Sequence, residues 1–347
     1  MFSFMPPKVL LGIDISSTAV KLVELRKKGK AYKVETYAIA PLPEGATSEG
    51  SLVNARLIAK AIKHALKKSR TRIKHCALAV PSSLVVSQKI RVPNDLDQYD
   101  LDSLIRLEAE QYIPYPIDAV QLDYNIIGTS KDGKHFDVLL VVSRSENINL
   151  RVDAAELAGL SVKLVDIESH ILEKLMNHLM VNHHNELLAV LDYGAVMTKI
   201  TFFKNSQLIF SQEYTFGGEQ LTSEIMQRFG LNLDEARQAK KSGNLPESYI
   251  PEVLEPFKKR MSKQLGRFLQ LFYAATHENH IDRILLAGGC ALIPGIDEQI
   301  QTDFNIPTLI ANPFLNCSLG KKIDPQYFTS DISTLLHATG LSLRGMD

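Results

Sequence analysis

Two segments of this 347-residue chain are so alike that they restrict how it can fold. Residues 12–21 read GIDISSTAVK and residues 190–199 read VLDYGAVMTK, so an aspartate follows a short apolar run in both. Asp14 and Asp192 are 178 residues apart, which is about half of the chain. A repeat of this length indicates two related halves, whereas solenoids repeat every ~20–50 residues.

Each segment has the pattern of a β-hairpin, with an apolar strand, small residues that allow a tight turn, and a second alternating strand. The remaining chain shows helical spacing and strand patterns in alternation. The predicted helices are 52–68, 101–112, 148–158, 216–228, 233–241, 247–276 and 334–343. Further strands are predicted at 76–80, 84–92, 120–127, 136–142 and 283–287. A β-rich block of about 75 residues therefore interrupts the first half of an α/β chain.

The charge and cysteine content exclude several functions. The chain has 39 Lys+Arg and 39 Asp+Glu, and this zero net charge argues against nucleic acid or another polyanion as a partner. The three cysteines include no CxxC pair, so neither a zinc knuckle nor a disulfide framework is predicted, which fits a reducing compartment. We expect no secretory leader, no membrane-spanning helix and no amphipathic anchor at the last residues.

The tip of the first hairpin carries groups suited to phosphate. Ser16, Ser17 and Thr18 offer hydroxyl and backbone N–H donors, and Lys21 offers a positive charge. Asp14, at the end of the strand, is suited to hold hydrated Mg²⁺. An ordinary polar turn has a similar composition, so this motif alone does not decide the function.

The second hairpin repeats the arrangement with Asp192, Gly194 and Thr198. Two aspartate hairpins facing each other across a cleft could share one Mg²⁺-triphosphate. An apolar strand also runs into Gly288-Gly289, where the backbone can pass close to a purine ring, although close packing alone can require such a pair. Gly217-Gly218 opens a predicted helix, and a helix N-terminus favours anions.

The order of these features resembles the actin-like ATPase superfamily, which includes actin, sugar kinases, heat-shock chaperones and FtsA. Within it, four motifs are similar to those of the PilM family of type IV pilus assembly proteins. They are VPSS (80–83), KIRVP (89–93), EAEQYIPYP (108–116) and FGGEQLT (216–222). The resemblance covers nearly the whole chain.

The resemblance implies an actin-like (ribonuclease H-like) α/β fold of two domains, with an inserted β-rich subdomain as in FtsA. The first actin-like subdomain is expected at 8–75 with 151–187 and 333–347. The insertion is expected at 76–150, the second actin-like subdomain at 188–215 with 282–332, and a helical nucleotide-side subdomain at 216–281.

By the same resemblance the ligand is ATP with Mg²⁺, which Asp14 and Asp192 would hold through water. The implied nucleotide-binding residues lie in two phosphate loops, a glycine-rich helix start, a lysine and a strand end: Asp14, Ser16, Ser17, Thr18, Lys21, Asp192, Gly194, Ala195, Thr198, Gly217, Gly218, Thr222, Lys240, Gly288, Gly289, Cys290 and Ala291. Position 237 is a departure, because it is Arg where such proteins usually carry a Glu that binds the ribose.

The implied function is that of a cytoplasmic ATP-binding scaffold of the pilus machine. It would bind the N-terminal tail of the inner-membrane protein PilN and other inner-membrane and motor components, and reach the membrane only through these partners. An FtsA-like division protein is an alternative, but such chains usually end in an amphipathic helix. A small-molecule kinase of the same fold is another, but kinases lack the β-rich block.

Turnover of ATP is expected to be slow or absent, because no residue that would orient an attacking water can be named from the sequence. Glu108 and Glu110 make a poor acid–base pair, and the histidines at 170, 178, 183, 184, 277 and 280 are best explained as surface residues. The catalytic residues are therefore unknown.

Apolar and aromatic residues in the β-rich block predict a partner-binding face. Some of them must form the block's own core, but aromatic side chains in a stiff Pro-bounded turn also suit peptide docking. The expected partner residues are Arg106, Leu107, Glu110, Tyr112, Ile113 and Tyr115.

Overall fold

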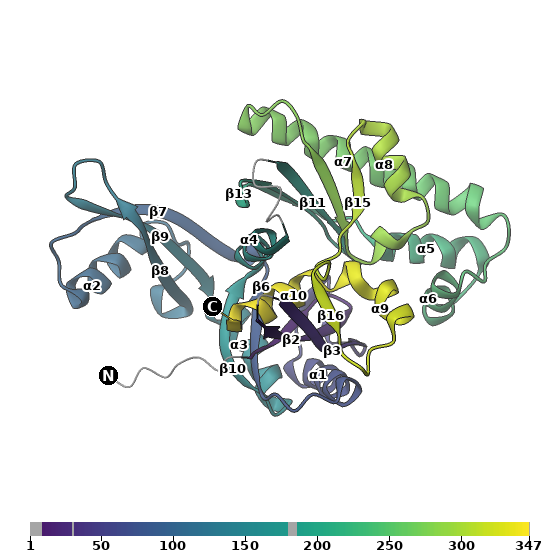
Figure 1. The fold of residues 1–347 in the computed structure, drawn as a ribbon, viewed down its shortest axis with the longest axis horizontal. Coiled ribbons are helices and arrows are strands. Elements are labelled where there is room, and N and C mark those ends of the chain that lie inside the picture. Colours follow the sequence, from purple (N-terminus) through teal and green to yellow (C-terminus); the bar gives the residue numbers. More distant parts are fainter. Residues whose placement is uncertain (1–8, 30, 180–185, 347) are drawn as a thin grey trace.

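Two mixed sheets form the body of the protein, and a smaller sheet projects from one side of it (Figure 1). The computed structural model describes residues 9–29, 31–179 and 186–346. Each of the two large sheets contains one of the predicted hairpins. The two aspartates therefore sit on separate sheets, as two related halves require.

The first sheet has the strand order β10-β6-β1-β2-β3-β16. Its strands are β1 (Leu11–Ile15), β2 (Ala19–Lys28), β3 (Ala31–Pro41), β6 (His75–Val80), β10 (Ser161–Ile167) and β16 (Cys317–Leu319). β1, β2 and β3 pair antiparallel, whereas β6, β10 and β16 run parallel to their neighbours. A short ribbon of β4 (Thr47–Ser48) and β5 (Ser51–Leu52) precedes the first helix.

Helices cover both faces of the first sheet. α1 (Ala55–Ser69) and α3 (Ser145–Leu157) pack on one face through a core of Leu, Ile and Ala side chains. α4 (Glu168–Leu179) and α10 (Leu336–Leu343) pack on the other face, between the two large sheets. The sequence fixes the start of α1 locally, because the Asn54 side chain accepts a hydrogen bond from the Leu57 N–H.

α10 lies directly on the backbone of its neighbours. A Cβ atom on Gly12 of β1 would lie 1.9 Å from the Ala338 carbonyl oxygen, and one on Gly340 would lie 2.3 Å from the Ile171 side chain on α4. Only glycine allows such close approach. β1, α10 and α4 are therefore packed without a side chain at these two positions.

The second sheet has the order β13-β12-β11-β14-β15. Its strands are β11 (Leu187–Tyr193), β12 (Thr198–Lys204), β13 (Gln207–Tyr214), β14 (Arg283–Ala287) and β15 (Thr308–Ile310). The accompanying helices are α5 (Gly218–Phe229), α6 (Leu233–Ser242), α7 (Glu255–Thr276) and α8 (Ile296–Phe304), whereas α9 (Pro325–Asp331) contacts β3 of the first sheet through Phe328 and Tyr37. Rings of Phe202 and Phe272 stack at 3.9 Å between centroids and anchor α7 to this sheet.

The projecting sheet has the order β7-β9-β8, with β7 (Val85–Pro93), β8 (Val120–Thr129) and β9 (His135–Arg144). α2 (Gln98–Ala109) packs against it over a core of its own. We refer to residues 81–144 as the insert. Figure 1 shows it standing away from the two large sheets.

Two strands lie outside the subdomains expected for them. β6 was expected in the β-rich block, but it pairs in parallel with β1 and β10 in the first sheet. β16 was expected with the second half, but it pairs with β3. Strand pairing between distant segments decides both cases, and a local pattern carries no such information. The predicted helix 247–276 likewise begins as α7 only at Glu255, after a π-helical turn at Ile250–Leu254.

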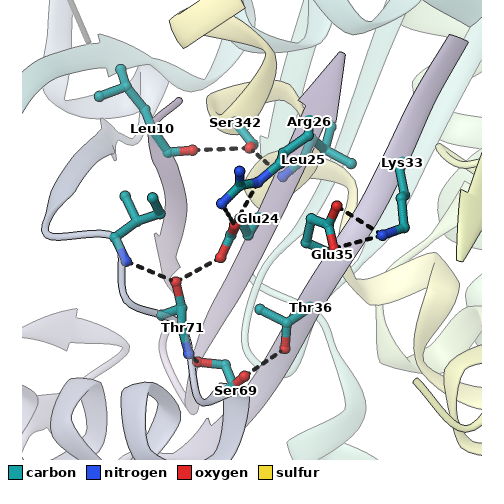
Figure 2. A network of polar contacts seen from close by, with 11 residues as sticks. Leu10, Glu24, Leu25, Arg26, Lys33, Glu35, Thr36, Ser69, Thr71 and Ser342 are labelled. Atoms are coloured by element: carbon teal, nitrogen blue, oxygen red, sulfur yellow. Dashed lines mark hydrogen bonds and ion pairs between the residues drawn. The ribbon is translucent and has the colours of Figure 1, made fainter. Parts of the chain in front are cut away.

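A polar network ties the first sheet to its surroundings (Figure 2). The buried Glu24 carboxylate on β2 accepts hydrogen bonds from Arg26 and, at 2.6 Å, from the Thr71 hydroxyl. The Ser342 hydroxyl of α10 donates to the Leu10 carbonyl at 3.0 Å and accepts from the Leu25 N–H at 3.1 Å. The loop after α1 and the helix α10 are thereby fixed to β2.

Candidate functional site

The two predicted hairpins form with the same register. Asp14 pairs across the strands with Lys21, and Asp192 pairs with Lys199. Both carboxylates act on one cation, because Asp14 and Asp192 each raise the pKa of Lys21 against the lowering effect of its burial. The fold therefore brings the repeated aspartates, 178 residues apart in sequence, to one place.

The first hairpin is neutralised internally. Asp14 is 4% exposed, and its Oδ2 lies 2.9 Å from the Lys21 Nζ. Burial alone would raise the pKa of Asp14, but Lys21, His337 and Lys199 outweigh burial and hold the pKa below its usual value. Asp14 is therefore an anion at neutral pH, locked to its own cross-strand neighbour.

The tip of the first hairpin is a closed turn. The Ser16 hydroxyl donates to the Ala19 carbonyl at 2.9 Å, and the Ala19 N–H donates back to it at 3.3 Å. Ser17 and Thr18 are half-buried beside it, and the Thr18 carbonyl accepts the Leu42 N–H at 2.9 Å. Of the three predicted hydroxyl donors, Ser16 is thus already used to hold the turn.

The second hairpin pairs its charges differently. Lys199 contacts Glu168 and Glu213, the latter at 3.3 Å, instead of Asp192. Asp192 keeps 23% of its side chain exposed, and its Oδ2 lies 3.7 Å from the Nδ1 of the buried His337. Asp192 is therefore less enclosed than Asp14 and, among the described residues, forms no ion pair with a lysine.

Glu168 and His337 are site residues that sequence reasoning missed. Glu168 opens α4, which follows β10 in the first half, and it reaches across to Lys199 of the second half. Burial alone would raise the pKa of Glu168, but Lys199 and His337 outweigh burial and hold it below its usual value. The available signal was an acid directly after a predominantly apolar segment of the first half.

The start of α5 rests on the tip of the second hairpin. The N–H groups of Gly218 and Glu219 donate to the carbonyls of Gly194 and Ala195 at 3.0 and 2.8 Å. A Cβ atom on Gly217 would lie 2.4 Å from the Ala195 carbonyl oxygen, so a larger residue cannot enter. In the same corner the Thr198 hydroxyl donates to the Phe216 carbonyl at 2.7 Å.

Lys240 points back at this helix start from α6. Its Nζ donates to the Thr222 hydroxyl at 2.6 Å and to the Gly218 carbonyl at 3.1 Å, and burial lowers its pKa. Arg237, at the position where a Glu was expected, instead pairs with Glu219 at 2.8 Å. The structure thus brings the predicted Gly217-Gly218, Thr222 and Lys240 together.

Gly288 crosses directly over the second hairpin. Its φ of 82° lies in the left-handed region, and a Cβ atom there would lie 2.3 Å from the Tyr193 carbonyl and 2.4 Å from Asp192 Oδ1. Its N–H donates to the Ser333 carbonyl at 2.9 Å, and the Ser333 hydroxyl donates back to the Gly288 carbonyl at 3.2 Å. These bonds join the second half to the segment that leads into α10.

The residues after Gly288 differ in accessibility. A Cβ atom on Gly289 would have no neighbour within 4 Å, whereas Cys290 and Ala291 are buried. Cys290 Sγ lies 3.7 Å from the Gly194 carbonyl, and burial raises its pKa to about 11. The Cys290 thiol is therefore protonated and packs as a small apolar group.

The expected surface histidines take ordinary structural roles where they are described. His170 lies 3.7 Å from Asp166, and the ring of His178 packs edge-on against Tyr32. His183 and His184 lie outside the described residues. Within residues 9–29, 31–179 and 186–346, no three His, Cys, Asp or Glu side chains are grouped to hold a metal by themselves.

Of the residues predicted to bind a partner, most are exposed on the insert and one is buried in its core. Leu107, Tyr112 and Tyr115 are 62%, 41% and 42% exposed, and Arg106 and Glu110 are also exposed. Ile113 is 8% exposed and packs with Ile105 and Val120, so its expected exposure to a partner is wrong. The turn after α2 directs Ile113 inward and leaves Tyr112 and Tyr115 outside, which the sequence pattern did not resolve. Tyr115 lies 5.0 Å beneath the Arg144 guanidinium, where the insert joins α3.

No helix of the described part of the chain combines the length and apolar content needed to cross a bilayer.

Comparison with solved structures shows the fold. A chain of a "PilM-PilN type IV pilus biogenesis complex" superposes with a TM-score of 0.80 at 24% identity, covering 97% of this chain and 98% of that chain. The ethanolamine utilization protein EutJ from Carboxydothermus hydrogenoformans gives 0.56 at 14% identity, with 98% and 91% covered. MreB 5 of Spiroplasma citri, bound to AMPPNP, gives 0.50 at 12% identity, with 96% and 94% covered. These likenesses confirm the predicted actin-like fold.

A family model described as type IV pilus assembly protein PilM matches residues 12–346, which is nearly the whole chain. The insert, the paired hairpins and the glycine-lined corner described above all lie within the matched range. The chain therefore belongs to the PilM family of type IV pilus assembly proteins.

Proposed function

We propose that this protein is a nucleotide-binding scaffold of the type IV pilus assembly machine, with Mg²⁺-ATP held between its two hairpins. The observation that carries the nucleotide part is the pair of aspartates at the same register position of two facing hairpins. Two glycines beside them, Gly217 and Gly288, have no room for a Cβ atom and keep backbone close to backbone. MreB 5, which shares the fold, binds a nucleotide analogue.

The residues present fit a hydrated magnesium ion. Mg²⁺ prefers carboxylate and water oxygens, and Asp192 has a partly exposed carboxylate that no described lysine holds in an ion pair. Asp14 is the second carboxylate, although Lys21 must share it. When bound, the metal would neutralise the phosphates, and Lys21 and the tip of the first hairpin would then bind them as well.

The ribose and base would lie toward α6 and the turn after β14. Lys240 has its amino group on the Thr222 hydroxyl, and Gly289 leaves an open space beside the chain. Arg237 is paired with Glu219, so neither side chain offers a free acid for ribose hydroxyls. We therefore expect the affinity for the ribose portion to be modest.

Steady-state turnover should stay below ~1 s⁻¹ for the purified protein alone. Glu168 is the acid best placed to orient a water, but it is tied to Lys199 and so is not free to act as a base. Release of phosphate from ATP should be measured with and without Mg²⁺. A faster rate would contradict a scaffold role for the nucleotide.

For the partner, the scaffold would bind the N-terminal tail of PilN and, with it, other inner-membrane and motor components. One structural relative was solved as a PilM-PilN complex. The exposed Leu107, Tyr112 and Tyr115 would supply apolar contacts to the peptide, and the exposed Arg106 and Glu110 would set its register. The protein would then be cytoplasmic and reach the inner membrane only through these partners.

Titration of a synthetic PilN tail peptide against wild type and two tyrosine variants tests the partner site. Tyr115→Ala should weaken binding by at least ~1–2 kcal/mol. Tyr99→Ala removes an exposed tyrosine at the other end of α2 and should change binding much less. Equal binding by the two variants would place the peptide elsewhere.

Calorimetric titration with ATP tests the nucleotide site, in the presence of Mg²⁺ and in the presence of EDTA. Binding that requires Mg²⁺ is expected. Absence of binding under both conditions would contradict the nucleotide part of the proposal and leave the partner part standing.

A further inference from the structure

A buried arginine near the candidate site forms no ion pair with an acid among the described residues. Arg151, on α3, is 5% exposed. Its Nη1 donates to the Asn147 carbonyl one turn earlier at 2.7 Å, and its Nε is buried without any hydrogen-bond partner. Across residues 9–29, 31–179 and 186–346, no carboxylate lies within ion-pair distance of this guanidinium.

Such an arrangement is costly in the free protein. A buried charge is normally compensated by an opposite charge, because its desolvation costs several kcal/mol when it stays unpaired. A guanidinium also offers five N–H donors in a planar fork, of which Arg151 directs only one group to a protein acceptor. An anion supplied from outside would complete both the charge and the hydrogen bonds.

Two acidic groups, Asp14 and Glu168, lie near enough to act on the charge of Arg151. β6 is flanked by β1 and β10, with Leu78 beside Ile13 and Val80 beside Ile167. The carboxyl ends of these three parallel strands therefore place Asp14 and Glu168 at one edge of the sheet. α3 packs against β6 and β10. Burial lowers the pKa of Arg151, and the negative charges of Glu168 and Asp14 oppose this lowering without cancelling it.

Neither acid forms an ion pair with Arg151, although both act on it electrostatically. Asp14 is paired with Lys21, and Glu168 is paired with Lys199. In the described part of the chain, the guanidinium is thus a buried positive charge near these two carboxylates that neither of them holds in an ion pair. A group with several negative oxygens, placed between the hairpins, is the anion that this geometry favours, because a guanidinium fork matches a phosphate in two hydrogen bonds.

We propose that Arg151 binds the terminal phosphoryl group of the nucleoside triphosphate and so distinguishes it from the diphosphate. This inference rests on the proposed nucleotide site and adds to it a residue outside both hairpins. Arg151 is seven residues beyond Arg144, the last residue of β9, so it stands at the root of the insert. The other root of the insert is also attached here, since the Ser169 N–H next to Glu168 donates to the Ser82 hydroxyl at 3.2 Å.

The test compares Mg²⁺-ADP with Mg²⁺-AMPPNP by calorimetry in wild type and Arg151→Met. Methionine keeps an unbranched stem and removes the charge. We expect Arg151→Met to lose about tenfold or more of its AMPPNP affinity while its ADP affinity changes by less than about threefold. The melting temperature without nucleotide should stay equal or rise, because an unpaired buried charge has been removed.

Three outcomes would overturn the inference while leaving the nucleotide site intact. They are an unchanged ratio of AMPPNP to ADP affinity, an equal loss for both nucleotides, and a marked fall in the melting temperature without nucleotide, which would indicate a structural role. If Arg151→Met cannot be purified, Arg151→Lys keeps the stem and the charge but not the fork. A wild-type ratio in Arg151→Lys would also overturn the inference. Failure of wild type to bind either nucleotide would instead contradict the proposed function itself.

Discussion

In the first hairpin Lys21 neutralises the aspartate opposite it, whereas in the second hairpin Lys199 turns away from Asp192 to Glu168 and Glu213. The backbone registers of the two hairpins are the same, so this difference does not arise from strand pairing. It arises because α4 of the first half presents Glu168 to the lysine of the second. The charges of the first hairpin stay within one half, and those of the second connect the two halves.

Asp14 and Asp192 look equivalent in sequence but have different surroundings in the structure. Asp14 is buried and paired with Lys21, so its main role is to stabilise the fold. Asp192 is partly exposed and lies 3.7 Å from His337, so it is the carboxylate more available to a ligand. Four substitutions test this contrast.

The largest effect is expected on stability from Asp14→Ala. Removing one partner of a buried ion pair leaves Lys21 uncompensated and should lower the free energy of unfolding by about 3–5 kcal/mol. Asp192→Ala, the matched change in the other hairpin, should cost less than about 1 kcal/mol. Urea unfolding of both variants measures the difference, and equal losses would remove the contrast between the hairpins.

Lys199→Met should cost about 2 kcal/mol at neutral pH, because it leaves the Glu168 carboxylate without its lysine. Since the folded-state pKa of Glu168 lies below its ordinary 4.5, its stabilising effect is complete above that pH and is lost as the pH falls through the lowered pKa. The difference between wild type and Lys199→Met should therefore shrink below pH ~4.5. A pH-independent difference would mean that the ion pair does not carry the effect.

Asp192→Ala should weaken Mg²⁺-ATP binding about tenfold, or ~1.4 kcal/mol, and weaken metal-free ATP binding less. The reason is that Asp192 is the carboxylate that no described lysine holds in an ion pair. Calorimetry with Mg²⁺ and with EDTA gives the two affinities. An unchanged affinity for Mg²⁺-ATP would exclude a metal shared by the two hairpins.

The smallest effect is expected from Ser16→Gly, which gives the first hairpin tip the residue that the second carries as Gly194. It removes the two hydrogen bonds between the Ser16 hydroxyl and Ala19 and adds backbone freedom, so about 1 kcal/mol of stability should be lost. Thermal melting measures it. A loss as large as that of Asp14→Ala would show that the turn, and not the ion pair, holds the first hairpin.

The sequence predicted most of the backbone because its signals are local or repeated. Strand alternation and small residues at a turn were enough to place both hairpins, and the glycine pair after β14 marked a close approach. Pairing between distant segments was not accessible in this way. Pairing between distant segments places β6 in the first sheet, pairs Lys199 with Glu168, and brings His337 beside Asp192.

Side-chain direction was the other limit. The apolar residues of 108–116 suggested a single face, but Ile113 turns into the core of the insert while Tyr112 and Tyr115 stay exposed. Within one short irregular turn, no periodicity distinguishes the inward from the outward positions. The nucleotide roles of the individual residues, carried over from the resemblance, remain predictions for the experiments above.

The glycine contacts of α10 have a consequence for how the site keeps its dimensions. At Gly12 and Gly340 no side chain separates α10 from β1 and α4, so these elements have no deformable layer there. Asp14 lies on β1, Glu168 opens α4 and His337 lies on α10. Asp14, Glu168 and His337 thus lie on elements that pack rigidly against one another, and the distances between these three side chains are fixed. The second hairpin, with Asp192 and Lys199, belongs to the other half, so a movement between the halves would change its distance from these three groups.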